Sequence, residues 1–131
     1  MLLDTSGLLC YFDHDEARHD SARILFDVAT RKVMHSYVLA EFVALAYARR
    51  FSRLATLEYL TDLTVHPDIE VIWVGQILHD NAMQYLKQQR LDKGYSLCDA
   101  ISFLIMQQRN ITDALTTDMH FEQAGFQRLL K

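Results

Sequence analysis

Short apolar runs alternate with longer segments in which apolar residues recur every three or four positions along this 131-residue chain. The clearest run is Ile69 to Val74, and others stand at Met1 to Asp4, Lys32 to His35, Asp113 to Thr117 and Phe126 to Leu130. Runs of this length, bounded by polar or turn residues, predict buried strands.

The segments between these runs have helical spacing. In chain order they are Leu8 to Phe12, a segment with Ala17, Ser21, Ile24, Leu25 and Val28 on one face, Tyr37 to about Phe51, a segment with Leu54, Leu57, Leu60 and Leu63, a segment with Leu78, Ala82, Tyr85 and Leu86, and Leu97 to about Arg109. Ser36 and Ser96 are predicted caps, and Thr5-Ser6-Gly7 is a predicted turn that caps the first helix through a hydroxyl. Strands alternating with helices predict an α/β fold whose central, mainly parallel, twisted sheet of four to five strands is covered by helices on both faces.

Composition adds few constraints. The length suits one domain over residues 1–131, because one Pro and four Gly leave no room for a flexible linker. No apolar run approaches the roughly 18 to 20 residues of a membrane span, and the N-terminus lacks the pattern of a signal peptide. Cys10 and Cys98 have no CxxC spacing, which favours a reducing compartment, by default the cytoplasm. The net charge of −4 disfavours a general nucleic-acid coat protein but not an enzyme that acts on RNA.

Four carboxylates close or interrupt apolar segments on separate predicted elements: Asp4, Glu41, Asp99 and Asp118. Asp4 and Asp118 each end a predicted strand, whereas Glu41 lies one turn into a helix and Asp99 lies in the first turn of another. A desolvated carboxylate costs several kcal/mol unless it is paired, and no Lys or Arg adjoins any of the four in the sequence. Since sites form beyond the carboxyl ends of parallel strands, the pattern predicts a cation shared by all four acids.

Ligands that are all oxygen select a hard cation such as Mg²⁺ or Mn²⁺ over Zn²⁺. Such an ion relieves repulsion among the acids, activates water and shields a phosphodiester as charge builds on it. Three acids also have a structural alternative as helix caps: Asp4 before the first helix, Asp99 in an S-x-x-D capping pattern, and Asp118 before a turn at Met119 to Gln123. The joint pattern favours the metal interpretation.

The spacing of the histidines does not indicate a zinc site. The six histidines show no HxxxH or HxH spacing, which disfavours a zinc site. His120, two residues after Asp118, is expected on the surface or in a turn, and contact with substrate is the alternative. The chain also lacks a nucleophile elbow, a Walker loop and a GxGxxG motif.

In this order and spacing, the acid motifs resemble those of PIN-domain ribonucleases, and among them the VapC-type toxins of bacterial toxin–antitoxin pairs. The motifs are Leu3-Asp4-Thr5-Ser6, Ala40-Glu41, Ser96-Leu97-Cys98-Asp99-Ala100, Leu115-Thr116-Thr117-Asp118-Met119-His120-Phe121 and the closing Ala124-Gly125-Phe126. The resemblance covers nearly the whole chain and implies a single PIN-like domain. Two departures are the short first strand and Cys98 beside Asp99, which is expected to affect packing only.

The resemblance implies a function and a site. It implies hydrolysis of RNA dependent on Mg²⁺ or Mn²⁺, with 5′-phosphate and 3′-hydroxyl products, frequent homodimerisation and inhibition by a cognate antitoxin protein. Asp4, Glu41 and Asp99 would be the principal metal ligands and catalytic residues, with Asp118 completing the acidic site. Ser6 and Thr116 would hydrogen-bond the carboxylates, although Ser6 fits a plain helix cap as well and Thr116 a β-branched strand residue.

Two basic clusters stand outside these motifs: Arg49, Arg50 and Arg53, and Lys87, Arg90 and Lys93. Each is either a set of charges favoured at a helix C-terminus or a contact to RNA phosphate. The cluster that follows the Glu41 helix is the candidate for RNA binding.

Two other functional classes remain open from the sequence. A receiver-like phospho-acceptor module also gathers acids at strand ends, but it needs an Asp that ends a middle strand and a Lys that ends a later one, and neither is found here. A non-catalytic interaction module would keep the acids for stability alone.

Overall fold

A strand of only two residues, β1, lies at the centre of the sheet. The computed structural model describes residues 1–89 and 93–131 and places five parallel strands in the order β3-β2-β1-β4-β5. The strands are β1 (Leu2–Leu3), β2 (Lys32–His35), β3 (Ile69–Ile72), β4 (Asp113–Leu115) and β5 (Gln127–Arg128). The predicted α/β fold with a parallel sheet of four to five strands is confirmed.

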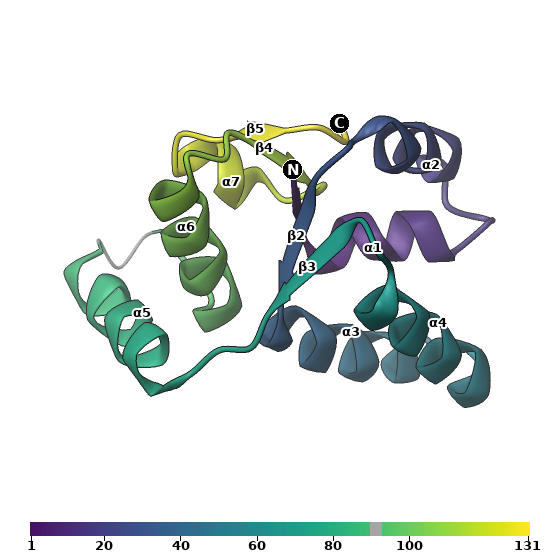
Figure 1. The fold of residues 1–131 in the computed structure, drawn as a ribbon, viewed down its shortest axis with the longest axis horizontal. Coiled ribbons are helices and arrows are strands. Elements are labelled where there is room, and N and C mark those ends of the chain that lie inside the picture. Colours follow the sequence, from purple (N-terminus) through teal and green to yellow (C-terminus); the bar gives the residue numbers. More distant parts are fainter. Residues whose placement is uncertain (90–92) are drawn as a thin grey trace.

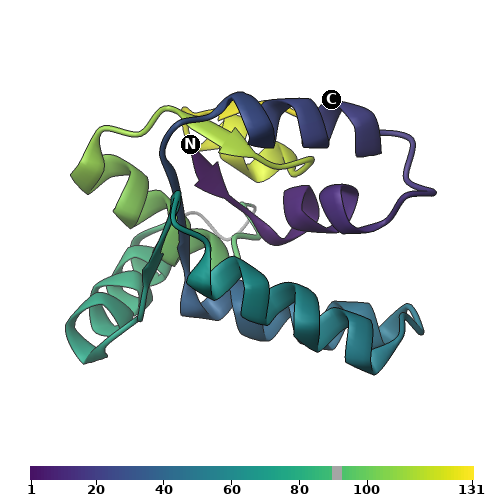
Figure 2. The same cartoon turned by 45° about the vertical axis from the view of Figure 1, so that its right-hand side comes forward.

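Helices cover both faces of this sheet. They are α1 (Thr5–Phe12), α2 (His19–Val28), α3 (Ser36–Ala48), α4 (Arg53–Val65), α5 (Gln76–Gln88), α6 (Leu97–Arg109) and α7 (Met119–Gln123). Helices α5 and α6 lie on one side of the strands and α1 to α4 lie on the other (Figure 1). In the turned view, α1 lies between α2 and the α3–α4 pair (Figure 2).

The alternation of side chains along β1 divides the core in two. Leu3 joins an apolar cluster with residues of α1 to α4, and Leu2 joins a second cluster with residues of α5, α6 and α7. Both side chains are fully buried. Successive strand residues point to opposite faces, so two residues in the central strand are enough to anchor both layers.

Strand order creates a switch point between β1 and β4. The chain proceeds outward from β1 to β2 and β3, then returns to the other side of β1 with β4 and β5. Connections at β1 and β4 therefore lead away in opposite directions, which opens a crevice beyond their carboxyl ends. Asp4 follows β1 and Thr116 follows β4 at this point.

Two sequence predictions about helix caps were wrong. Asp4, not a hydroxyl of the Thr5-Ser6-Gly7 segment, is the N-cap residue of α1, and it makes no side-chain capping bond. Ser36 is the first residue of α3, and its Oγ accepts a hydrogen bond from the backbone N–H of Val74 instead of capping the helix. A polar side chain that the local sequence predicts as a helix cap can thus form a hydrogen bond with a distant segment instead.

The predicted buried face of α2 is right only for Leu25, which is partly buried against the core. The buried residues of α2 are Ala22 and Phe26, whereas the predicted Ile24 and Val28 are 58% and 75% exposed. In α4 the predicted leucine face is half right, because Leu60 and Leu63 are buried but the two leucines of the first turns are exposed. Leucines spaced by three residues drift around a helix of 3.6 residues per turn, so one stripe does not stay on one side.

Two further predictions were only partly right, because the strand predicted over Phe126 to Leu130 covers only Gln127–Arg128 and the turn predicted over Met119 to Gln123 is the helix α7. Others agree with the structure. Ser96 caps α6 as predicted, and α5 covers the predicted segment. The predicted Arg90 of the second basic cluster lies outside the described residues. Among the described helices, none is long and apolar enough to cross a membrane.

Candidate metal centre

Asp4 is buried directly after β1, with 5% of its surface exposed. Its Oδ2 accepts hydrogen bonds from Thr116 Oγ1 at 2.8 Å and from Ser6 Oγ at 3.1 Å. Ser6 lies in the first turn of α1 and Thr116 directly follows β4. The structural alternative for Asp4, a side-chain cap of α1, is wrong, since this carboxylate faces the two hydroxyls instead.

Backbone N–H groups orient those hydroxyls. Ser6 Oγ accepts the N–H of Thr117 at 2.9 Å, and Thr116 Oγ1 accepts the N–H of Asp118 at 3.0 Å. Each hydroxyl has only one proton, and accepting from the backbone leaves that proton free for Asp4. The predicted contacts of Ser6 and Thr116 with a carboxylate are therefore present in the structure.

Asp99 is held at the start of α6 by a reciprocal capping box. Ser96 Oγ accepts the Asp99 N–H, and Asp99 Oδ2 accepts the Ser96 N–H, both at 3.0 Å. The carboxylate is nevertheless 6% exposed and lines the pocket beside β1. The capping and pocket positions predicted as alternatives are both present, because Asp99 Oδ2 accepts the Ser96 N–H and also faces His120 in the pocket.

Glu41 and Asp118 are more exposed than the sequence pattern suggested. Glu41 lies on the solvent side of α3 although apolar residues surround it in the sequence, and the Asp118 side chain is 35% exposed. Asp118 Oδ1 also accepts the His120 N–H at 2.9 Å, as predicted for a cap of α7. The cost of burying a carboxylate therefore favours a cation beside Asp4 and Asp99. Glu41 and Asp118 are more exposed and belong to the site because they line the same pocket.

One cavity of about 260 Å³ brings all four acids together. Its lining includes Asp4, Glu41, Asp99 and Asp118, contributed by the β1–α1 junction, α3, α6 and the β4–α7 junction. The cavity lies at the switch point of the sheet, where the carboxyl ends of β1 and β4 meet α3 and α6. Segments that are 114 residues apart in the chain thus form one acidic pocket.

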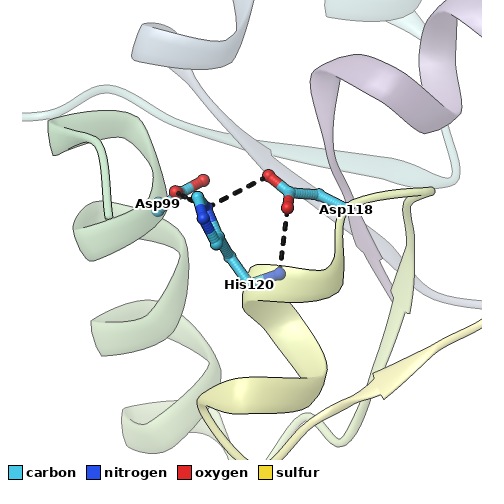
Figure 3. A group of neighbouring side chains, drawn as sticks. All are labelled: Asp99, Asp118 and His120. Atoms are coloured by element: carbon cyan, nitrogen blue, oxygen red, sulfur yellow. Dashed lines mark hydrogen bonds and ion pairs between the residues drawn. The ribbon is translucent and has the colours of Figure 1, made fainter. Parts of the chain in front are cut away.

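His120 lies in the acidic pocket, although the sequence favoured a surface or turn position for it, with contact to substrate as the alternative. Its Nδ1 lies 2.9 Å from Asp99 Oδ2 and 3.4 Å from Asp118 Oδ2, and it lines the acidic pocket (Figure 3). Asp99, Asp118 and His120 each offer a ligand atom, and these atoms lie within 4.8 Å of one another. The expectation of a surface or turn position for His120 was incomplete. The Asp118-Met119-His120 spacing across a helix start was the signal that could have revealed it.

Burial and repulsion act on the acid at the centre of the pocket. Burial, reinforced by the charge of Asp99, raises the pKa of Asp4 from its ordinary 3.8 to about 6, although the Thr116 and Ser6 hydroxyls oppose the shift. Burial and then the charges of Glu41 and Asp4 also raise the pKa of the Cys98 thiol. Cys98 therefore stays protonated at neutral pH and packs as an apolar side chain, as expected.

Comparison with known proteins identifies the fold family. The PIN domain family model matches residues 1–127. This chain belongs to the PIN domain family. The crystal structure of Mycobacterium tuberculosis VapC20, described as a toxin that cleaves the sarcin–ricin loop, is similar with a TM-score of 0.87 and 25% sequence identity, over 99% of this chain and 98% of that one. A comparison with curated proteins gave no match.

The donor set of this PIN domain fits a divalent ion. Four carboxylates and one imidazole converge on the pocket, and within residues 1–89 and 93–131 no Lys or Arg forms an ion pair with any of those carboxylates. Burial and the nearby charge of Asp99 raise the pKa of Asp4, which is the effect that a bound cation would oppose. Oxygen donors in this number suit Mg²⁺ or Mn²⁺, which would replace mutual repulsion by attraction.

The three arginines of the first basic cluster have different surroundings. Arg49 lines a second cavity, of about 140 Å³, together with Arg18, and this cavity shares Ser6 and Leu45 with the acidic pocket. The Arg53 guanidinium instead lies 4.6 Å from the centre of the Tyr47 ring. Arg50 has a positive φ of 62° at the end of α3. Arg49 is therefore the member of the predicted cluster that adjoins the acids.

Membership of the PIN domain family removes one functional alternative. A receiver-like domain is a different family, so the phospho-acceptor interpretation is set aside. A non-catalytic interaction module would keep the same fold, and a cleavage assay separates it from an enzyme.

Proposed function

We propose that this PIN domain is a divalent-metal-dependent endoribonuclease that hydrolyses RNA phosphodiester bonds as the toxin of a toxin–antitoxin pair. The observation that carries the proposal is the convergence of Asp4, Glu41, Asp99 and Asp118 from four separate segments on one pocket at the sheet's switch point. Family membership and the similarity to VapC20 support the ribonuclease assignment.

Asp4, Glu41, Asp99 and Asp118 are the residues that would hold Mg²⁺ or Mn²⁺. When bound, the ion supplies activation of water and neutralisation of charge on the phosphodiester. The protein's own contribution is positioning. Ser6 and Thr116 fix the orientation of Asp4, while the capping box of α6 fixes Asp99. Ligands that are held by neighbouring hydrogen bonds lose less freedom when the ion binds.

The substrate and partners are proposed from the same similarity. VapC20 is a toxin that cleaves the sarcin–ricin loop, so ribosomal RNA is the first substrate to test here. A cognate antitoxin and a second copy of the chain are the proposed protein partners. Exposed apolar side chains such as Leu54, Leu57 and Val65 on α4, and Trp73 and Ile77 near the start of α5, offer surface for such partners. The cytoplasm is the proposed compartment, because Cys10 and Cys98 are both free thiols.

The decisive test is cleavage of total cellular RNA by the purified protein with Mn²⁺, compared with EDTA and with Asp99→Asn. Discrete fragments are expected only for the wild type with metal, and cleavage by the variant should fall by about 10³-fold. The asparagine Oδ1 can still accept the Ser96 N–H, so the variant should keep the capping box and its circular dichroism spectrum.

Three outcomes separate the alternatives. Fragments that form with Mn²⁺, but not with EDTA or with Asp99→Asn, would support the nuclease. Mapping their ends would then locate the cleavage site. Equal cleavage by the variant would remove Asp99 from the catalytic machinery. Failure of the wild type to cleave any RNA fraction, with and without metal, would overturn the proposal in favour of the interaction module.

Arg49 is expected to contribute to RNA binding and Arg53 is not. Arg49→Gln should raise KM for RNA by about 3- to 10-fold with little change in kcat, because a phosphate contact outside the acidic pocket acts equally on ground and transition states. Arg53→Gln is the matched control, since its guanidinium packs on Tyr47. Equal effects of the two substitutions on KM would show that the cluster acts only through its net charge.

A further inference from the structure

The acidic pocket contains a nitrogen donor as well as oxygen donors. We propose that His120 Nδ1 is a direct metal ligand beside Asp99 and Asp118, and that this mixed set makes the centre bind Mn²⁺ in preference to Mg²⁺ (Figure 3). The proposal rests on the proposed function in placing a divalent ion in this pocket. It adds an imidazole ligand that all-carboxylate reasoning from the sequence did not include.

Donor spacing carries the first step. Ligands at adjacent positions of an octahedral ion with bonds of about 2.1 Å lie about 3.0 Å apart, and those of a tetrahedral ion lie about 3.4 Å apart. His120 Nδ1 lies 2.9 Å from Asp99 Oδ2 and 3.4 Å from Asp118 Oδ2. The imidazole nitrogen therefore lies at ligand spacing from both carboxylates, and the three donor atoms lie within 4.8 Å of one another.

Two contacts hold His120 in place. Its backbone N–H donates to Asp118 Oδ1, and outside the donor set the ring packs nearly perpendicular to Tyr95, with centroids 5.3 Å apart at 76°. The other ring nitrogen, Nε2, faces Gly94, where an added Cβ would lie 3.9 Å away. With the proton on Nε2, the neutral ring presents the Nδ1 lone pair toward the carboxylates.

Ligand chemistry then sets the preference for the ion. Mg²⁺ favours oxygen ligands and retains its water, whereas Mn²⁺ accepts imidazole more readily and stands higher in affinity for nitrogen donors. A pocket with one imidazole should therefore discriminate between the two ions. Removing the imidazole should abolish most of the preference for Mn²⁺ over Mg²⁺ and leave the affinity that the carboxylates provide for either ion.

The rival role for His120 is orientation of Asp99 by a hydrogen bond. In that case Nδ1 keeps its proton, donates to Asp99 Oδ2 and never contacts the ion. The two roles differ in whether nitrogen is bonded to the metal, which pulsed electron paramagnetic resonance of bound Mn²⁺ measures directly through the coupling to ¹⁴N.

The test combines that spectrum with calorimetric titration of MnCl₂ and MgCl₂ into the wild type, His120→Phe and the control His14→Phe. Phenylalanine retains an aromatic ring against Tyr95 but has no donor atom, and His14 is an exposed turn residue. We expect a ¹⁴N coupling in the wild type and in the control that His120→Phe lacks. We also expect the Mn²⁺ Kd of His120→Phe to rise by about 10-fold or more, with the Mg²⁺ Kd changed by less than about 3-fold.

Bound Mn²⁺ without ¹⁴N coupling in the wild type would overturn the assignment whether or not His120→Phe folds, because that measurement needs no variant. An unchanged Mn²⁺ Kd in a folded His120→Phe would overturn it as well, and so would a wild type that binds no Mn²⁺. RNA cleavage is measured separately. A ¹⁴N coupling without cleavage would support the ligand and contradict the nuclease, whereas cleavage without the coupling would contradict only the ligand.

Discussion

Asp4→Asn is expected to lower RNA cleavage by about 10³-fold and to raise the stability of the metal-free protein at pH 7.5. Activity falls because the carboxylate nearest the strand ends no longer helps to bind the ion. Stability rises because the wild-type protein holds a charged, buried carboxylate close to Asp99 without a compensating cation. Asparagine has the same shape, and its Oδ1 can accept from the Ser6 and Thr116 hydroxyls.

The sign of this effect follows from the raised pKa. A carboxyl whose pKa is about 6 in the folded protein and 3.8 in the unfolded chain binds its proton more tightly when folded. Its contribution to stability is fully present below pH 3.8 and is lost as pH rises through about 6, at a total of about 3 kcal/mol. The advantage of Asp4→Asn should therefore be small at pH 4 and reach about 2 kcal/mol at pH 7.5, or roughly 5 to 10 °C in Tm.

Thermal unfolding in EDTA at pH 4, 5.5 and 7.5 checks this expectation, with Asp80→Asn as the control because that exposed carboxylate lies on α5. Saturating Mn²⁺ should narrow or reverse the difference at pH 7.5, since the ion stabilises the wild type by mass action. An Asp4→Asn protein that is less stable than the wild type at pH 7.5 in EDTA would show that the charge supports the fold.

Gly7→Ala is expected to destabilise the protein by about 3 to 5 kcal/mol, and in a domain of marginal stability it should lower Tm by at least about 10 °C. A Cβ on Gly7 would lie 1.9 Å from the carbonyl oxygen of Leu115 and 2.5 Å from its carbonyl carbon. Both are backbone atoms of a central strand, so no side chain can rotate out of the way. The same oxygen accepts the Asp4 N–H at 3.2 Å, so moving α1 away from β4 also disturbs the acid site.

Gly75→Ala is the matched control. No atom lies within 4 Å of the Cβ position at Gly75, and its φ of −93° is accessible to alanine. Helix propensity alone would make alanine better than glycine by about 1 kcal/mol inside α1, so the expected loss opposes the local preference. A Tm of Gly7→Ala equal to or higher than that of the wild type, measured beside Gly75→Ala, would contradict the close contact of α1 with β4.

At the switch point, the close contact of α1 with β4 forms the acidic site and also buries one of its carboxylates. Gly7 allows α1 to contact β4 closely, and that contact brings Ser6 to within 3.0 Å of Thr116. The same contact buries Asp4 and raises its pKa. Repulsion among the acids of this pocket destabilises the protein unless a cation binds, and a loss of stability of this kind is common at functional sites.

The sequence by itself determined the order and kind of the elements and four of the pocket's acids. Apolar runs and helical spacing were enough because burial of apolar side chains drives both patterns, and each pattern is local. The capping box of Ser96 and Asp99 was likewise readable, since all its atoms lie within four residues. The apolar runs also placed Asp4 and Asp118 at strand ends; Asp4 directly follows β1, whereas β4 ends at Leu115 and Asp118 is the N-cap residue of α7.

Only the tertiary structure decided which faces are buried and which polar groups meet. Ile24 and Val28 fit a helical stripe, but packing of α2 buries Ala22 and Phe26 instead, because the orientation of a helix depends on its neighbours. Ser36 is bound by Val74 from another segment, and Asp4 by Thr116, 112 residues away. His120 belongs to the pocket for the same reason. Its partner Asp99 lies on a different helix, and no local rule of spacing relates two side chains that only the fold brings to 2.9 Å.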